Sequence, residues 1–239
     1  MRFLGQVISE GIAYGKVEFI QSKYDEFQTK PNDTNQLDIF EQSIEIATKK
    51  LDEEITNTKK NYTDRISEIF ETHKYIVNDP IVINRTKELI KSNHTASMAY
   101  AKAIKEMLDE FNKIDNEYML GRIVDIIDAT DRVNSVLNCI TKQNLKEYQE
   151  PTILILEDLK PSIIYSIDNS NIKGFIADKG YYHQHSGIIA RTIKIPGVVS
   201  ENLSDHVKTN DYVLIDCYKG EIFINPDETI IKERIEGGL

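Results

Sequence analysis

The sequence predicts an α/β domain formed from both ends of the chain, with an all-helical bundle inserted in its middle. Two observations predict this fold class: short apolar runs bounded by glycine or proline near both termini, and a helical period of apolar residues between them. The 239 residues are enough for two modest domains. We expect residues 1–24 and 146–239 to form the α/β domain, and residues 34–142 the helical one.

The first 22 residues have the pattern of β-strands, with alternating apolar positions from Lys16 to Ile20. From Leu37 the apolar period becomes three or four residues, which indicates a helix with one buried face. This face consists of Leu37, Phe40, Ile44, Ala47, Leu51 and Ile55.

Four further helices are predicted in the central segment. The helical pattern resumes over Ile66–Val77, and Asp79 is placed to cap a helix from about Pro80 to Lys91. Thr95 can cap the next helix, and a last long helix runs from about Asn116 to Asn138. Such closely spaced helices pack antiparallel as a bundle.

Strand patterns return after Lys146. Pro151–Leu156 and Ile172–Ala177 are continuous apolar runs, as expected for buried strands of an α/β sheet. Tyr212–Asp216 and Glu221–Asn225 flank a short turn with a glycine and predict a hairpin.

Composition excludes several classes of function. The net charge of −10 argues against a nucleic-acid binder. No apolar run reaches the roughly 18 residues that a membrane-spanning helix needs. The N-terminus has no signal-peptide pattern, and Cys139 and Cys217 are too few for a disulfide framework. We therefore expect a cytoplasmic protein without membrane or nucleic-acid partners.

The segment Asp178–Arg191 is the strongest candidate for chemistry. It follows a predicted strand, contains a glycine turn with His183 and His185, and leads into a helix-competent run. A neutral histidine at such a turn can attack a phosphoryl group, and the new phosphate would lie near the N–H groups of the helix start. Arg191, expected near the first turns, could balance the phosphate charge or form a surface salt bridge.

This segment resembles the phosphohistidine signature Gly-Gly-x-Thr-Ser-His-x-x-Ile-x-Ala-Arg of phosphoenolpyruvate-utilising enzymes. His185 falls at the phosphorylated position. The wider chain resembles the N-terminal half of enzyme I of the bacterial sugar phosphotransferase system, the phosphoenolpyruvate–protein phosphotransferase. The further matching segments, in chain order, are Ser9–Gly15, Ile69–His73, Asp115–Tyr118 with Arg122, Asp125 and Asp128, Glu157–Ser162, and Ile224–Pro226.

The resemblance implies a two-step phosphoryl relay. His185 would accept phosphate from phosphoenolpyruvate and pass it to a histidine of the small carrier protein HPr. Arg191, His183, Gln184 and Ser186 would support the active site. In the family, a C-terminal barrel binds phosphoenolpyruvate and Mg²⁺ and forms a homodimer. The present chain is expected to be a monomeric N-terminal fragment with no cofactor of its own.

The departures from the family pattern cluster at this site. The second glycine of the signature is Tyr181, and the Thr-Ser pair is His183-Gln184. A threonine that can hydrogen-bond the active histidine is replaced by Ile164. His183 or Gln184 could supply that hydrogen bond. A rival interpretation is an enzyme I relative that only docks or regulates a partner.

The resemblance also places the HPr-binding surface in the helical domain. The residues carried over by position are Tyr75, Ile76, Asp79, Val82 and Arg122. Core packing is the alternative for the apolar ones, and an ion-pair network with Asp125 and Asp128 the alternative for Arg122. His73 is expected to be a core or interface histidine.

Two other interpretations of the site were weighed. His183 and His185 could ligate a metal, but no further ligands accompany them, and we expect none. A swivelling domain from a pyruvate phosphate dikinase or phosphoenolpyruvate synthase would explain His185 but not the helical insertion.

Overall fold

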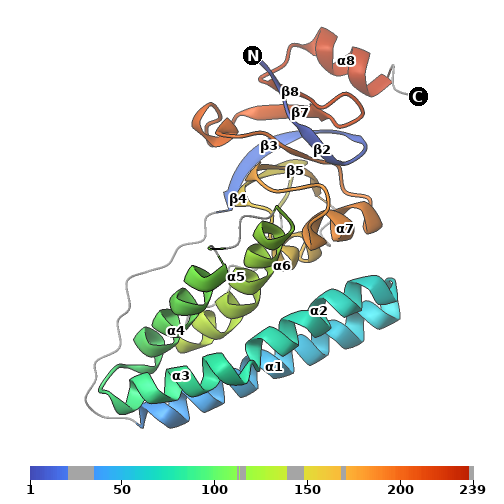
Figure 1. The fold of residues 1–239 in the computed structure, drawn as a ribbon. Coiled ribbons are helices and arrows are strands. Elements are labelled where there is room, and N and C mark those ends of the chain that lie inside the picture. Colours follow the sequence, from blue (N-terminus) through green and yellow to red (C-terminus); the bar gives the residue numbers. More distant parts are fainter. Residues whose placement is uncertain (21–34, 112, 114–116, 139–147, 168–170, 237–239) are drawn as a thin grey trace. The chain divides into compact units, whose positions relative to one another are not determined.

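The computed structural model describes residues 1–239 except 21–34, 112, 114–116, 139–147, 168–170 and 237–239, and omits the side chains of 117–121. The chain divides into two compact units, one of residues 1–23 and 145–239, the other of residues 24–144. The first unit contains the sheet and the second the long helices α1–α5 (Figure 1). None of the described helices is long and apolar enough to cross a membrane.

The first unit contains one mixed sheet of eight strands, in the order β1-β8-β7-β3-β4-β5-β6-β2. Strands β3 to β6 are parallel to one another, and the remaining neighbours are antiparallel. The strands are β1 (Arg2–Leu4), β2 (Gln6–Ser9), β3 (Ile12–Ile20), β4 (Thr152–Asp158), β5 (Ile172–Lys179), β6 (Gly197–Val199), β7 (Tyr212–Asp216) and β8 (Glu221–Ile224). The predicted fold class, α/β with a helical bundle, is confirmed.

One continuous segment joins the two ends of this sheet. Strands β1 and β2 hold the two outer positions, yet only Gly5 separates them in sequence. Because a single residue spans less than about 4 Å, the sheet must curl until its edges meet. The Gly5 amide donates to the Gly220 carbonyl at 2.9 Å at this junction. Closure leaves few unpaired strand edges.

The helical unit lies between two strands that are neighbours in the sheet. Strand β3 ends at Ile20 and β4 begins at Thr152, and the two pair in parallel with Lys16 opposite Thr152. The chain therefore leaves the sheet at the carboxyl end of one strand and returns at the amino end of its neighbour. Such an insertion does not disturb strand pairing.

A close approach between β5 and β6 requires glycine at position 197. A Cβ atom at Gly197 would lie 2.0 Å from Cζ of Phe175, whose side chain is fully buried. Gly197→Ala should therefore lower the free energy of unfolding by about 1–3 kcal/mol, measured by urea denaturation. Adding Phe175→Leu should recover part of this loss, because the smaller side chain makes room. Equal stability of Gly197→Ala and the parent would contradict the packing.

The described residues of the second unit form five helices. They are α1 (Gln36–Asn61), α2 (Asp64–Val77), α3 (Pro80–Lys91), α4 (Ala96–Phe111) and α5 (Glu117–Leu137). Helix α3 begins and ends where the sequence predicted. Its start is fixed by Asp79, which accepts hydrogen bonds from the amides of Ile81 and Val82, and by Pro80 in the first turn. The predicted stripe of α1 is confirmed by Phe40 and Leu51, which are fully buried.

The described residues of the first unit also form three short α-helices and a single 3-10 turn. The α-helices are α6 (Pro161–Tyr165), α7 (His185–Thr192) and α8 (Glu228–Glu236), and the 3-10 turn is Leu203–Asp205. Helices α6 and α7 pack against each other. Helix α8 is held to the sheet by Arg234, which forms ion pairs with Asp216 at 3.1 Å and Glu221 at 2.7 Å. Both carboxylates are buried, and Arg2 also pairs with Glu221.

Candidate functional site

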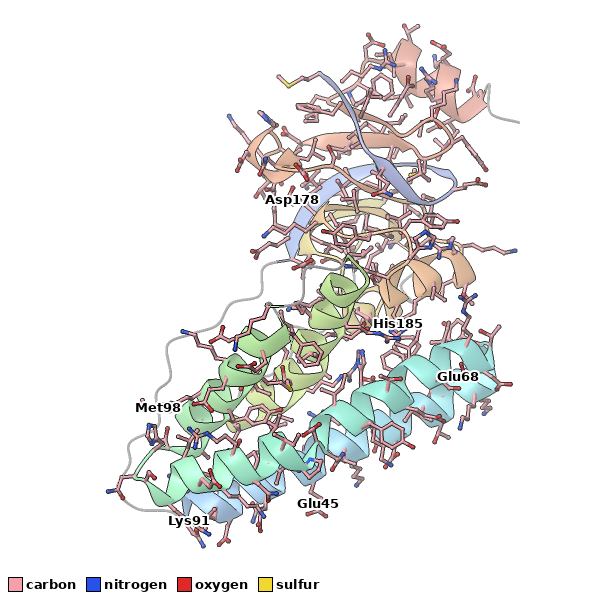
Figure 2. All side chains as sticks on the ribbon, viewed as in Figure 1. Glu45, Glu68, Lys91, Met98, Asp178 and His185 are labelled. Carbon is pink, nitrogen blue, oxygen red and sulfur yellow. The ribbon has the colours of Figure 1, made fainter. Side chains whose placement is uncertain are left out.

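His185 is the first residue of helix α7, where the turn after β5 ends (Figure 2). Gly180 starts this turn with a φ of +154°, a conformation that other residues rarely adopt. The N-cap residue Gln184 has an extended backbone and forms no side-chain hydrogen bond to the helix. The positive end of the helix dipole is therefore not neutralised by its N-cap side chain.

Gln184 instead stabilises the turn before it. Its side-chain Oε1 accepts a hydrogen bond from the Tyr181 amide at 3.1 Å, and its own amide donates to the Tyr181 carbonyl at 3.1 Å. Gln184 is 6% exposed, and its Nε2 has no hydrogen-bond partner among the described residues. The buried hydroxyl of Ser186 also has no partner within the described part of the chain. Two buried polar groups thus flank His185 in sequence.

The two nitrogens of the His185 ring differ in their surroundings. The residue is half-buried, and its Nδ1 is closed off from solvent. His183, two residues earlier, is exposed and contacts the Tyr182 ring edge-on at 5.2 Å between centroids. Only His185 therefore combines a place on the helix with a partly enclosed ring.

Ile164, which stands where the family has a threonine, lies in the one-turn helix α6. Its side chain is fully buried. The position therefore contributes to the apolar core, and it provides no hydroxyl to orient an imidazole. In this respect the local environment of α7 departs from the family pattern, as the sequence indicated.

Arg191 occupies the last turn of α7 and not the first turns, where we had expected it. Its Nη1 donates to the carbonyls of Ile8 at 3.0 Å and Tyr182 at 3.1 Å. The guanidinium also lies 4.1 Å from the centre of the Tyr182 ring. Arg191 reaches Tyr182 from the last turn because helix side chains lean towards the N-terminus. A long side chain such as arginine therefore extends back over the preceding turn.

No group of three or more histidine, cysteine or carboxylate side chains that could hold a metal ion occurs among the described residues. His183 and His185 therefore have no third ligand in this part of the structure. The described residues therefore provide no set of ligands for the Mg²⁺ that the family implies. Cys139 lies outside the described residues.

Cys217 is a second nucleophilic residue type near the sheet, but its environment makes it inert. Burial raises the pKa of its thiol to about 12, with the Asp216 charge adding to the effect. At pH 8 the thiolate fraction is then roughly 1 in 10⁴. Iodoacetamide should leave Cys217 unmodified in the folded protein and label it after denaturation, as read from peptide masses. Rapid labelling of the native protein would contradict this burial.

The predicted docking residues divide into exposed and structural ones. Tyr75 is 79% exposed and Ile76 is half-buried, so both can meet a partner. Val82, in contrast, is 3% exposed and belongs to the helical core, which agrees with the core-packing alternative for this residue. The exposed apolar side chain at the start of α3 is Ile81, at 77%. The apolar period does not identify Ile81, because the capping turn at Asp79 decides which side chain points outward.

Arg122 and Asp79 both have structural partners. Asp79 caps α3, and Arg122 pairs with Asp125 at 3.5 Å. Asp125 and Asp128 are buried, each with one oxygen 3.9 Å from a ring nitrogen of His73. His73 itself is fully buried, which confirms it as a core histidine. The His73 imidazole on α2 and the two carboxylates on α5 thus lie side by side inside the unit.

Comparisons with known proteins define the class. Residues 4–122 match the family described as PEP-utilising enzyme, N-terminal, and residues 148–220 match PEP-utilising enzyme, mobile domain. The chain belongs to this family of phosphoenolpyruvate-utilising enzymes. The two matches correspond to the start of the chain with the helical insertion, and to the segment that carries His185.

The resemblance to the N-terminal half of enzyme I is confirmed by individual relatives. The phosphoenolpyruvate-protein phosphotransferase of Geobacillus stearothermophilus is 33% identical over 80% of this chain and 34% of that protein. That of Priestia megaterium is 30% identical over 95% of this chain and 40% of that protein. The chain thus spans less than half the length of these relatives.

Two solved structures agree in fold. The solution NMR structure of Enzyme I (nEIt) matches with a TM-score of 0.71 and 27% identity, covering 98% of this chain and 97% of that chain. The N-terminal domain of Enzyme 1 - Nitrogen matches with a TM-score of 0.61 and 15% identity, covering 96% of each chain. At that lower identity, the second match shows the fold alone.

Proposed function

We propose that this chain is the cytoplasmic phosphoryl-carrier part of a phosphoenolpyruvate–protein phosphotransferase, with His185 as the acceptor. The single observation that carries the proposal is the position of His185 at the start of α7, where the N-cap side chain leaves the helix terminus uncapped. Backbone N–H groups at a helix N-terminus stabilise the negative charge of a phosphate. The family membership supplies the chemistry for which such a site is suited.

Nε2 of His185 is the nitrogen that accepts the phosphate in this proposal. An attacking nitrogen must be reachable and must carry a lone pair, and Nδ1 is closed off from solvent. The P–O bond of phosphoenolpyruvate breaks as the Nε2–P bond forms, and the pyruvate enolate leaves and takes up a proton. In the second step the Nε2–P bond breaks as a histidine nitrogen of HPr bonds to phosphorus. The chain contributes positioning and charge stabilisation.

The other components lie outside this chain. Phosphoenolpyruvate and Mg²⁺ would bind to a further part of the longer protein, whose relatives are more than twice as long as the present chain. HPr would contact the helical unit around Tyr75, Ile76 and Ile81. Exposed apolar side chains beside charged ones suit a small docking interface, in which the apolar part provides affinity and the charges provide register.

Transfer of ³²P from phospho-HPr of the same organism tests the proposal. We expect close to one phosphate per chain, with the acid lability and alkali stability of a phosphohistidine. Binding of HPr should be followed by calorimetry in the same preparation. No label despite HPr binding would contradict the carrier role and favour a docking module.

A further inference from the structure

Arg191 and Tyr182 lie at opposite ends of the segment that carries His185, yet they are in direct contact. We infer that they form a clamp, named here the Tyr182–Arg191 clamp, that holds the turn before His185 and thereby positions its imidazole. Arg191 is then a positioning residue and not a ligand of the phosphate. The effect on catalysis rests on the proposed function, whereas the clamp itself does not.

Three contacts fix the guanidinium. Its Nη1 bridges two backbone carbonyls, that of Ile8 in strand β2 at 3.0 Å and that of Tyr182 at 3.1 Å. The Tyr182 ring lies against it at 4.1 Å, which suits a cation–π contact. Hydrogen bonds from a charged donor are stronger than neutral ones. The clamp therefore ties the turn, the end of α7 and a strand that closes the sheet to one another.

Gly187 provides the space that the clamp needs. A Cβ atom at this position would lie 2.8 Å from the Tyr182 carbonyl oxygen and 3.2 Å from Nη1 of Arg191. Gly187 is four residues before Arg191, on the same face of α7, so the arginine side chain passes over it. Glycine in a helix costs about 1 kcal/mol relative to alanine. A glycine here is accounted for by the contact between Tyr182 and Arg191.

The turn is thus held from two directions. On the buried side, Gln184 bonds twice to Tyr181. On the exposed side, Arg191 holds the next residue, Tyr182. His183 lies between Tyr182 and Gln184 in sequence, and His185 follows Gln184 directly. Since the backbone on one side of His185 is fixed in this way, the direction of its side chain is restricted as well.

Of the guanidinium nitrogens, Nη1 already bridges two carbonyls, and the charged group lies against an aromatic ring. The partners of the clamp, moreover, include Tyr182, which stands in a stretch where this chain departs from the family signature. The two roles differ in one respect that can be measured: only the clamp makes Arg191 depend on Tyr182.

The test uses the whole chain and two readouts that need no phosphate. The variants are Arg191→Gln, Tyr182→Ala, their combination, Gly187→Ala, and Tyr182→Phe as the matched control that keeps the ring. We measure amide hydrogen exchange at Tyr181 and Gln184 and the NMR signals of the His185 ring across a pH titration. Arg191→Gln should speed exchange about tenfold and alter the ring signals. Tyr182→Ala should do so to a smaller extent, because it removes the ring contact and leaves the Tyr182 carbonyl in place.

The combined variant should add little to Arg191→Gln, because loss of the guanidinium already removes the ring contact. Gly187→Ala should behave like them, and Tyr182→Phe like the parent. Where phospho-HPr transfer is active, kcat should fall and KM should stay unchanged. Unaltered exchange and ring signals in Tyr182→Ala would overturn the clamp, even if Arg191→Gln unfolds. Absence of transfer in the parent would overturn only the proposed function, because the NMR readouts remain.

Discussion

Replacing His185 with alanine abolishes phosphate incorporation from phospho-HPr, and the label falls at least about 10³-fold, to background. The reason is that no other nucleophile at the start of α7 combines the helix position with a partly enclosed ring. The thiol of Cys217 is buried and its pKa is raised. The measurement is the acid-labile ³²P retained by the chain after a fixed exposure to phospho-HPr.

His183→Ala is the matched control, since it removes an imidazole two residues away. Its ring is exposed and contacts Tyr182 edge-on, so its loss should reduce the rate by less than about tenfold. Both variants should retain the native far-ultraviolet circular dichroism. Labelling of His185→Ala, together with loss of label in His183→Ala, would contradict His185 as the acceptor and indicate His183 instead.

His73→Leu lowers the stability of the helical unit by about 3 kcal/mol, the largest effect expected on the fold. The imidazole is fully buried, and its two nitrogens each lie 3.9 Å from a carboxylate, one on Asp125 and one on Asp128. Removing the imidazole takes a polar neighbour away from two buried carboxylates, and buried carboxylates are costly to leave inadequately compensated. Amide exchange in α2 and α5 should therefore accelerate about 100-fold, since each 1.4 kcal/mol corresponds to a factor of ten.

The exchange measurement on His73→Leu includes an internal control in the first unit. Amides of strands β4 and β5 lie in the other unit and should keep their protection. His94→Leu is the matched substitution, because His94 lies in the turn after α3, is partly exposed, and hydrogen-bonds the Leu89 carbonyl at 3.1 Å. Equal protection of α2 in His73→Leu and His94→Leu would show that the buried group does not stabilise the bundle.

The sequence predicts those parts of the fold that depend on long periodic patterns. The stripe of α1 and the capped start of α3 at Asp79 are local signals, and both are confirmed. Strand β6 has only three residues and α6 only five, so neither contains a full period. These elements depend on tertiary pairing, as does closure of the sheet, which is evident only from the partners of β1 and β2.

The candidate site is predictable in part for the same reason. A motif places His185 correctly at the start of a helix, because strand, turn and helix follow in order. The motif does not reveal that Arg191 bends back to the Tyr182 carbonyl, or that Gln184 bonds to Tyr181 and not to the helix. Nor does it distinguish Val82 from Ile81, since a change of one residue moves a side chain about 100° around the helix.

The most direct test of the central proposal is to identify the nitrogen of His185 that carries phosphate. The chain should be uniformly ¹⁵N-labelled, phosphorylated with phospho-HPr and examined by ¹⁵N–³¹P correlation NMR. We predict a single phosphoramidate at Nε2 of His185, with Nδ1 protonated. A phosphate on Nδ1, on His183 or on any other residue would contradict the account.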